Sequence, residues 1–509
     1  MSTRWDFDLF IDGTWDPGEA GGTPIEVLNP ATEAVIGSVP DATPKDAARA
    51  IAAARAAFDE GPWPWMKPAE RAAALRRMGD ALTARAAELR ELVVAETGTV
   101  GVLTDYVQAG GAIGMFESNA ALAEQGFEWM EVDPPTAGPT GMSGRAILRE
   151  PVGVVGAITP FNYPFMLNVL KTAPALAAGC TVVLKPHPWT PLDAFMIAQA
   201  AIDADLPPGV LNVITGHVAV GTELTTNPLV DMITMTGSTA TGKSIMAVGA
   251  ETMKRLHLEL GGKSAHVVLD DVGEDYARSI GFGEVLMHCG QGCVLQTRLL
   301  LPEHLLDAYR DGVEEARAHV RIGDPTDSTT TLGPLIREQQ RAKVEALVAA
   351  GIAEGAELVC GGRRPEGIDR GFFYEPTVLI GTNDMRIAQE EIFGPVLTVI
   401  PYSGSDTDAV RRANDSIYGL GGRVIAASTA RAFNVARRIR AGLMSAQGVG
   451  ASSSGDLGPG GGQGPGWGST PAGIGQSGAF GGFKQSGIGR EWGHLGFETF
   501  TEVKSLSWS

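Results

Sequence analysis

Short apolar runs alternate with amphipathic segments through the middle of the chain. From Pro151 onward, each run of Val, Ile and Leu is followed by a stretch with apolar residues three and four positions apart. Strands buried on both faces have this composition, and segments of this length form the helices that cross between them. The predicted strands are 152–158, 180–184, 210–214 and 232–235, and the predicted helices are 167–176, 191–203 and 218–226. We therefore expect a parallel sheet covered on both faces, which binds ligands at the carboxyl ends of its strands.

A second α/β pattern begins after Lys263. Its predicted strands are 265–269, 298–301, 378–380 and 396–400, and its predicted helices are 303–319, 338–354 and 430–441. Ahead of the first pattern, β-like runs between residues 7 and 39 indicate an edge hairpin, and helical spacing follows at 46–58, 69–97 and 102–124. At 509 residues the chain exceeds one compact core, so we expect a multidomain α/β protein.

Two segments break these patterns. Prolines and glycines in 131–150 lead into a strand-like piece, which is either an ordinary surface hairpin or an oligomerisation arm. An arm would give the last strand-like piece, 497–506, an edge with which to pair. Residues 448–482 contain 15 glycines in 35 positions and form either a mobile loop or a flap over a substrate entrance.

The charge balance excludes some partners. The chain has 40 Lys and Arg against 59 Asp and Glu, a net charge of −19, so phosphate backbones and anionic lipid are repelled. Neither a signal-like N-terminus nor a run of 18 apolar residues is present in the sequence. Four cysteines in a chain of this length favour a reducing compartment, and we expect a cytoplasmic protein without nucleic-acid or membrane partners.

Cys293 is the candidate nucleophile. It follows Gly290-Gln-Gly292, and the two glycines would clear side-chain bulk from the approach to its thiolate, which could then attack a substrate. The alternative is a buried, inert cysteine, which describes most unpaired cysteines. Its segment alone does not decide between the two.

Three further polar residues follow predicted strands. Asn162 could donate an amide hydrogen bond, Lys185 could supply a cation, and Glu259 could act as a carboxylate base. Each has an ordinary explanation, as a turn former, a surface charge or a solvated carboxylate.

A different class of enzyme is also compatible with part of the chain. The segment Gly237–Ser244 satisfies the P-loop pattern G-x-x-x-x-G-K-[ST] between a strand and a helix, and Val267–Asp270 could end in a magnesium ligand. A P-loop nucleoside-triphosphatase is therefore the alternative function. It leaves the cysteine segment unexplained.

Nearly the whole chain resembles the aldehyde dehydrogenase superfamily, in its NAD(P)-dependent, non-acylating form. Eight motifs in the family's order carry the resemblance. They are Ile158-Thr-Pro-Phe-Asn162-Tyr-Pro, Val183-Leu-Lys185-Pro, Thr236-Gly-Ser238-Thr, Leu258-Glu259-Leu-Gly-Gly-Lys, Gly290-Gln-Gly-Cys293, Glu390-Glu391-Ile-Phe393-Gly-Pro-Val, Asn414-Asp-Ser-Ile-Tyr-Gly-Leu and Gly481-Gly-Phe-Lys484-Gln-Ser-Gly-Ile-Gly-Arg490-Glu.

The resemblance implies an oxidation of an aldehyde to a carboxylic acid. Cys293 would attack the aldehyde, the Asn162 amide and the Cys293 backbone N–H would stabilise the oxyanion, and Glu259 would activate water to hydrolyse the thioester. Losing one oxyanion donor typically costs about 2.7–4 kcal/mol. No metal is implied, and a non-catalytic relative is disfavoured because all three residues are present.

The resemblance also assigns the NAD(P) contacts. Gly237 and Ser238 would face the pyrophosphate, Lys185 the adenosine ribose, and Glu391 with Phe393 the nicotinamide riboside. Phe161 and Thr159, from the first motif, complete the expected cofactor contacts.

The expected fold is a Rossmann-like cofactor-binding domain, 1–130 and 152–262, with a second α/β catalytic domain, 263–490, that includes the loop 448–482. Residues 131–151 and 491–509 would form a β oligomerisation arm of a homodimer or homotetramer.

The sequence departs from the family pattern at three places. Pro188 stands where a glutamate often binds the ribose hydroxyls, and without that carboxylate a 2′-phosphate meets no repulsion, so NADP is possible. We expect NAD because some relatives with a proline at this position use it. Gln447 replaces a common asparagine ahead of the long glycine-rich loop, so the aldehyde itself is not identified, although Phe161, Tyr163, Phe165 and Trp467 favour an apolar one. Cys289 is either a packed small residue or the partner of Cys293 in a reversible disulfide.

Overall fold

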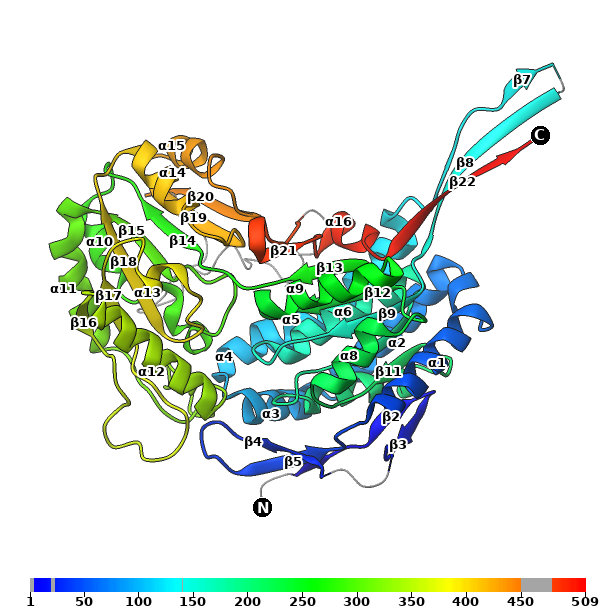
Figure 1. Ribbon diagram of the computed structural model, residues 1–509, viewed down its shortest axis with the longest axis horizontal. Coiled ribbons are helices and arrows are strands. Elements are labelled where there is room, and N and C mark those ends of the chain that lie inside the picture. Colours follow the sequence, from blue (N-terminus) through cyan, green and yellow to red (C-terminus); the bar gives the residue numbers. More distant parts are fainter. Residues whose placement is uncertain (1–3, 20–22, 140, 450–477) are drawn as a thin grey trace.

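Two α/β units and a projecting β arm make up the molecule, as the computed structural model shows (Figure 1). It describes residues 4–19, 23–139, 141–449 and 478–509. Most of the predicted flap, including Trp467, lies outside the described residues.

The first unit is built on a mostly parallel sheet. Among the described residues it has eight strands, in the order β21-β13-β12-β9-β10-β11-β2-β3. The five central strands run parallel, and the strands beyond them are antiparallel to their neighbours. The bounds are β21 Gly487–Ile488, β13 Arg255–Glu259, β12 Met232–Thr236, β9 Val154–Ile158, β10 Thr181–Lys185, β11 Leu211–Val213, β2 Leu9–Ile11 and β3 Thr14–Asp16.

Helices cover both faces of this sheet, as the unbroken apolar strands require. On β9, Val155 and Ala157 pack toward one set of helices and Val154 toward the other. The first face carries α6 Pro164–Ala178 and α7 Leu192–Asp203, backed by α2 Pro68–Ala84, α3 Ala86–Thr97 and α5 Gly110–Ala121. The opposite face carries α1 Pro44–Asp59, α8 Val218–Thr226 and α9 Thr239–Gly249.

Two predicted long helices are interrupted. The segment 69–97 breaks at Arg85, whose φ and ψ of −107° and 13° are not helical, so it forms α2 and α3. The segment 102–124 contains α4 Gly101–Leu103 and α5, together with two wider π turns, Thr104–Ala109 and Leu122–Gly126. Such turns hold one extra residue and occur often at functional sites.

The second unit repeats the sandwich of helices around a sheet. Its seven described strands lie in the order β16-β17-β18-β15-β14-β19-β20 and are parallel except for β16 at one edge. The bounds are β16 Glu357–Cys360, β17 Thr377–Ile380, β18 Val396–Tyr402, β15 Arg298–Pro302, β14 Ala265–Val268, β19 Gly421–Ala426 and β20 Leu443–Gly448.

The helices of the second unit follow the predicted positions with shorter ends in two cases. The predicted helix 430–441 ends at Ala436, and the predicted helix 303–319 is regular only from Leu306 to Arg317. The helices are α10 Glu274–Ile280, α11 Leu306–Arg317, α12 Glu338–Ala353, α13 Arg386–Gln389, α14 Asp406–Asn414 and α15 Thr429–Ala436. Residues 487–488, which the sequence prediction groups with this unit, pair instead with β13 of the first sheet.

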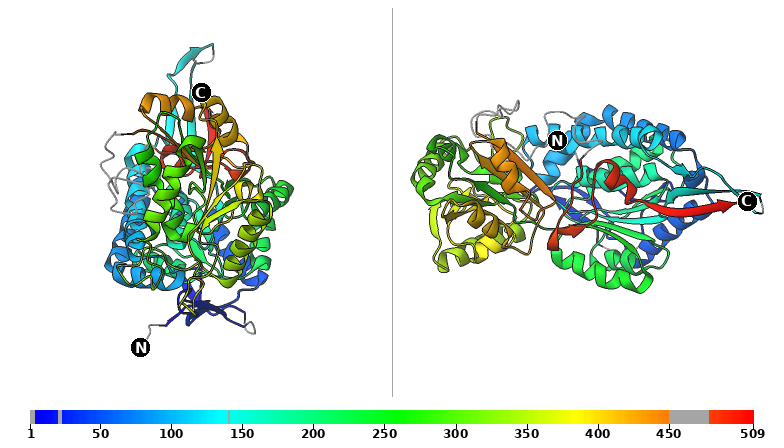
Figure 2. Two further views of the ribbon diagram at one scale, coloured as in Figure 1. Left: turned by 90° about the vertical axis from the view of Figure 1, so that its left-hand side faces the viewer. Right: turned by 90° about the horizontal axis from the view of Figure 1, so that it is seen from above.

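The arm projects from the first unit and ends near the C-terminus (Figures 1 and 2). Strand β8, Gly141–Pro151, pairs antiparallel along its length with the last strand, β22, Thr501–Trp508. β6 Met130–Val132 and β7 Thr136–Gly138 pair with β8 on its other side, and α16 Gly493–Glu498 leads into β22. The expected pairing of the last strand with the 131–150 segment is therefore present, although Phe497 belongs to α16.

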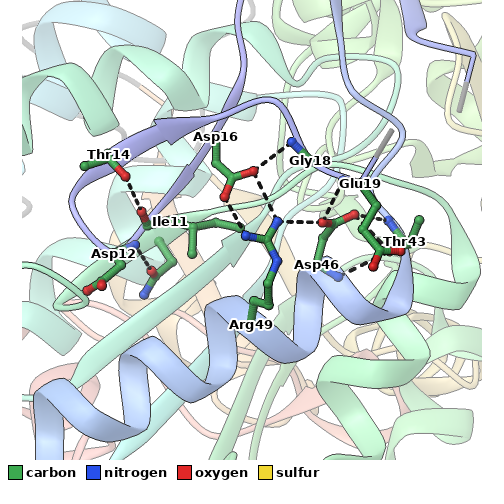
Figure 3. A network of polar contacts seen from close by, with 10 residues as sticks. Ile11, Asp12, Thr14, Asp16, Gly18, Glu19, Thr43, Asp46 and Arg49 are labelled. Carbon is green, nitrogen blue, oxygen red and sulfur yellow. Dashed lines mark hydrogen bonds and ion pairs between the residues drawn. The ribbon is translucent and has the colours of Figure 1, made fainter. Parts of the chain in front are cut away.

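The N-terminal strands divide between two sheets. The hairpin β2-β3 turns at Asp12 and Gly13, both left-handed, and joins the edge of the large sheet. Arg49 of α1 holds this hairpin, because its guanidinium donates to Asp16 of β3 and to the buried Asp46 at 2.6 and 2.7 Å (Figure 3). A separate small sheet is formed by β1 Trp5–Asp6, β5 Val35–Val39 and β4 Ile25–Leu28.

Candidate functional site

The parallel strands of the first sheet end at one level, and the predicted polar residues follow those ends. Register pairs place Lys185 of β10 beside Ile158 of β9, and Glu259 of β13 beside Thr236 of β12. Asn162 lies in the short loop between β9 and α6. The arrangement is the one that parallel α/β sheets use for ligands.

A narrow cavity of about 70 Å³ connects the two units at this edge. Cys293, Asn162 and Glu259 all line it, so the structure brings together the three predicted catalytic residues from separate segments. Thr236 and Glu491 are its other polar residues. The remaining wall consists of aliphatic, methionine, aromatic and glycine residues: Leu103, Val107, Tyr163, Met166, Leu167, Leu170, Met287, Gly292, Val294, Leu295, Phe480 and Trp492.

The backbone before Cys293 is strained. His288 and Cys289 have φ of 45° and 53°, a left-handed region that costs a non-glycine residue roughly 1–2 kcal/mol. Gly290 continues the turn at 69°, and a Cβ there would lie 1.9 Å from the backbone oxygen of Gly394. Gly290 therefore serves close backbone packing rather than access to the thiol, whereas Gly292 does line the cavity.

The thiol of Cys293 is half-buried, and its surroundings disfavour the thiolate. Burial raises its pKa most, and the carboxylates of Glu391, Glu259 and Glu491 raise it further. The free protein at neutral pH therefore holds Cys293 mainly as a thiol, and a positive group brought close to the sulfur would favour the reactive form.

Glu259 is the last residue of β13 and is only 2 % exposed. Burial raises its pKa well above the ordinary value, and Glu491 adds to the shift, while Lys171 and Arg490 oppose it. A carboxylate with a raised pKa is a stronger base toward water than an ordinary one.

A buried ion pair next to this site is not predicted by the sequence analysis. Lys171 of α6 is fully buried, and its Nζ lies 2.5 Å from Oε1 of Glu491, which lines the cavity. Lys171 is the one charged residue in the otherwise uncharged helix 164–178, and that isolation is the signal that could have identified it.

Asn162 is held by the loop that carries Cys293. Its Nδ2 donates to the backbone carbonyl of Gln291 at 2.9 Å, two residues before Cys293. Gln291 is itself fixed, because its Oε1 accepts from the backbone of Ile336 at 3.0 Å. The amide is thus oriented toward the loop of Cys293, as the predicted oxyanion donor would need to be.

The predicted cofactor residues form two groups. On the sheet edge, Lys185 is buried, and this burial lowers its pKa to about 8. Its backbone carbonyl accepts from the backbone N–H of Thr159. The hydroxyl of Thr159 donates to Asn168 at 2.6 Å, so it is engaged within the fold. Ser238 is exposed at the N-cap of α9, directly after Gly237.

The second group comes from the loop after α13. Oε1 of Glu391 accepts from the backbone of Gly262 at 2.9 Å. Phe393 has a left-handed φ of 59°, and Gln340 holds this turn by donating to its carbonyl at 2.8 Å. The rings of Phe393 and Phe161 meet edge-on at 5.6 Å, which brings the two groups together.

The P-loop interpretation is wrong. Helix α9 begins at Thr239, so only Gly237 and Ser238 are outside regular structure, and Lys243 lies within the helix. A phosphate-cradling loop needs most of that segment to be non-helical. The strand Val267–Asp270 proposed to carry magnesium belongs to β14 and its end, in the other sheet.

Cys289 is fully buried in a cluster with Leu332, Leu335 and Val344, on the side of the second sheet. Cys293 packs against a different cluster. This packing supports the small-residue interpretation over a disulfide. Gln447 lies on β20 and Pro188 is half-buried near the sheet edge, and neither lines the cavity.

Within the described parts of the chain, no three or more His, Cys, Asp or Glu side chains gather as metal ligands would. In the same residues, no helix is long and apolar enough to cross a membrane.

Comparison with known proteins agrees with this geometry. Residues 15–506 match the family model described as "Aldehyde dehydrogenase family". The chain is 38% identical over 503 residues to 3-succinoylsemialdehyde-pyridine dehydrogenase from Pseudomonas sp, covering 98% of both chains.

Two solved structures show how far the similarity extends. Mycobacterium tuberculosis aldehyde dehydrogenase complexed with NAD+ is 42% identical with a TM-score of 0.89, covering 99% of this chain and 98% of that one. A mutant of aldehyde dehydrogenase C from Pseudomonas syringae, in complex with NAD+ and octanal, is 37% identical with a TM-score of 0.88 at the same coverage. With the cysteine, amide and carboxylate converging on one cavity in this fold, the chain belongs to the aldehyde dehydrogenase family.

Proposed function

We propose that this aldehyde dehydrogenase oxidises an apolar aldehyde to the carboxylic acid through Cys293, Asn162 and Glu259. The observation that carries the proposal is the convergence of these three side chains, from three separate segments, on one narrow cavity. Each supplies a different part of the chemistry.

Cys293 is the nucleophile. Its sulfur attacks the aldehyde carbon and forms a thiohemiacetal, and negative charge develops on the former carbonyl oxygen. The Nδ2 group of Asn162 and the backbone N–H of Cys293 stabilise that oxygen. Removing one such donor costs about 2.7–4 kcal/mol of transition-state stabilisation.

Glu259 is the base of the second half-reaction. Oxidation leaves a thioester on Cys293, and water must be deprotonated as it attacks this carbon. The raised pKa of Glu259 suits it to take that proton. The products are the carboxylic acid and the free thiol.

The described residues fit a dinucleotide across the sheet edge. Ser238 is exposed at the start of α9, where backbone N–H groups favour a pyrophosphate. Lys185 would contact the adenosine ribose, and Glu391 with Phe393 the nicotinamide riboside. Bound NAD(P)+ supplies the hydride acceptor. Two similar structures contain NAD+, and NAD+ is therefore the proposed cofactor.

The cavity wall supports an apolar aldehyde. Six leucine and valine and two methionine side chains line it, and among the described residues its only charged lining groups are the acidic Glu259 and Glu491. A carboxylated aldehyde would meet these carboxylates without a compensating cation in the wall. An apolar wall of this kind suits the chemistry of an aliphatic chain.

The arm supports a homo-oligomer. β22 presents Val503, Leu506 and Trp508 exposed by 60%, 48% and 46%, and β8 presents Met142 exposed by 59%. A second copy would cover these side chains and the free edge of β22. Four unpaired cysteines support the cytoplasm as its compartment. The division into cofactor-binding, catalytic and arm domains remains part of the proposal.

Turnover with a straight-chain aldehyde and NAD+ tests the proposal. Wild type should reduce NAD+ and release one carboxylate for each dinucleotide reduced. Asn162→Ala should lower kcat about 10²- to 10³-fold. Unchanged turnover in Asn162→Ala would contradict the assigned oxyanion site.

A further inference from the structure

A buried polar group adjoins Asn162 without lining the cavity. Thr99, Gln108 and His288 are no more than 5% exposed. Nε2 of Gln108 donates to Oγ1 of Thr99 at 2.8 Å and reaches the backbone carbonyl of Asn162 at 3.5 Å. Oγ1 of Thr99 lies 3.0 Å from Nδ1 of His288. These three side chains therefore connect the loop of Asn162 to the loop of Cys293.

The neighbouring hydrogen bonds determine whether Nδ1 of His288 donates to Thr99 or accepts from it. Thr97 donates its hydroxyl to the carbonyl of Val93 at 2.6 Å, because a carbonyl can only accept. The hydroxyl hydrogen in the 2.7 Å contact between Thr97 and Thr99 must then belong to Thr99. Thr99 has no second hydrogen to offer, so it accepts from His288. His288 is therefore an Nδ1–H donor.

His288 begins the strained turn that leads to the nucleophile. The turn is closed by Gln291, whose backbone N–H and Nε2 donate to the carbonyl of His288 at 3.0 and 3.2 Å. The carbonyl of Gln291 in turn accepts from Nδ2 of Asn162. A left-handed pair of non-glycine residues persists only where its surroundings hold it. The bond from His288 to Thr99 is such a constraint.

Gln108 has its own unusual backbone. It lies in the π turn Thr104–Ala109, and its neighbour Val107 lines the cavity. The wider turn thus presents consecutive side chains to the cavity and to Thr99. π turns occur often where a helix is adapted to a function.

We propose that His288, Thr99 and Gln108 are positioning residues that hold the Asn162 amide and the Cys293 backbone N–H in place for the developing oxyanion. The inference rests on the proposed function of Asn162. None of the three touches the aldehyde. They act by fixing the two loops relative to each other. Burial lowers the pKa of His288 to about 4, so its ring stays neutral and donates throughout the working pH range.

The test separates oxyanion chemistry from the reactivity of the thiol. Alkylation of Cys293 by iodoacetamide builds no oxyanion at an attacked carbonyl, whereas aldehyde oxidation does. Thr99→Val removes the acceptor at nearly constant volume, and His288→Leu removes the donor. His288→Asn keeps an N–H donor near the Nδ1 position and tolerates a left-handed φ.

We expect Thr99→Val and His288→Leu to lower kcat about 10- to 100-fold, because a displacement of about 1 Å at a reacting group causes a loss of rate of this size. Their alkylation rates should stay within about threefold of wild type, since displacement of the oxyanion donors leaves the sulfur's own reactivity in place. His288→Asn should recover most of the kcat. Thr83→Val, which removes a hydroxyl bonded within an exposed part of α2, is the matched control and should change neither rate.

If Thr99→Val and His288→Leu do lose turnover, two further results would still overturn the inference. One is a loss of alkylation equal to the loss of kcat, which would indicate general damage to the loop. The other is a His288→Asn variant as slow as His288→Leu. Asn162→Ala, measured alongside, separates the two claims. If it keeps full turnover, the proposed oxyanion site fails; if it is slow while Thr99→Val and His288→Leu are fast, only the positioning role fails.

Discussion

Nε2 of His257 lies 3.6 Å from Oε1 of Glu259, two residues along the same strand and on the same face of β13. Burial lowers the pKa of His257 well below its ordinary value, so the ring is neutral and gives Glu259 no counter-charge. Glu259 therefore keeps a raised pKa in a site that it shares with Cys293. The two half-reactions depend on it in opposite ways.

Glu259→Gln is expected to slow the complete reaction and speed the attack on a simple electrophile. Turnover should fall about 10²- to 10⁴-fold, because the water that hydrolyses the thioester loses its base. Removing the negative charge should lower the pKa of Cys293 and raise its alkylation rate at pH 7. Intact mass should show an acyl group that remains on the protein. Equal losses in turnover and alkylation would exclude this role.

The alkylation rate of Cys293 should rise steadily with pH. Its pKa is raised by burial and three carboxylates, so the thiolate fraction below the pKa grows about tenfold for each pH unit. Iodoacetamide kinetics from pH 6 to 9, with peptide mapping to Cys293, measure this slope. A plateau below pH 7 would contradict the raised pKa.

The acid limb of kcat should lie above the ordinary range of a carboxyl group. Glu259 must be ionised to accept a proton, and its pKa is raised, so activity should increase as the pH rises through the raised value. A pH profile of kcat, measured where hydrolysis of the thioester limits the rate, gives the pKa of this acid limb. An acid limb centred near the usual Glu value would mean that another group is the base.

Discrimination between NAD+ and NADP+ should depend on residue 188. Pro188 itself supplies no carboxylate beside Lys185, whereas a glutamate there would add repulsion against a 2′-phosphate. Pro188→Glu should lower kcat/KM for NADP+ relative to NAD+ by at least about tenfold, or 1.4 kcal/mol. Pro188→Gln is the neutral control of the same size. Equal effects of Glu and Gln would show that charge is not the cause.

The arm should mediate self-association. Replacing Leu506 and Trp508 by Lys places charges among the exposed apolar side chains of β22. The wild type should have a solution mass of two or four times 53.2 kDa, and the double variant a smaller one. Light scattering measures both. A monomeric wild type would contradict the proposed homo-oligomer.

The fold could be predicted where burial of a segment produces a regular pattern of apolar residues in the sequence. Strands such as 232–235 are covered on both faces and read as continuous apolar runs. β20 is half-buried, with the sequence Leu-Met-Ser-Ala-Gln-Gly, and gives no such run, so it was not predicted. The π turn at 104–109 was also missed, because one extra residue changes the helical period only locally.

The site was predictable where residues follow strand ends and match the family motifs, as Asn162 and Glu259 do. Lys171 and Glu491 are 320 positions apart, and His288 contacts Thr99, which is 189 positions away. Tertiary packing sets which residues pair, so the isolated charge of Lys171 could mark that residue but not its partner. The same limit explains the P-loop interpretation, since the motif at 237–244 does not reveal that the helix starts at Thr239.

Replacing Cys293 by serine, beside a matched Cys289→Ser variant, tests the central claim most directly. Both changes remove one sulfur, four residues apart, but only Cys293 lines the cavity. NAD+ reduction with a straight-chain aldehyde should fall at least about a thousandfold in Cys293→Ser and stay near the wild-type rate in Cys289→Ser, because a serine hydroxyl lacks the acidity of the thiol. Wild-type turnover in Cys293→Ser would contradict the account.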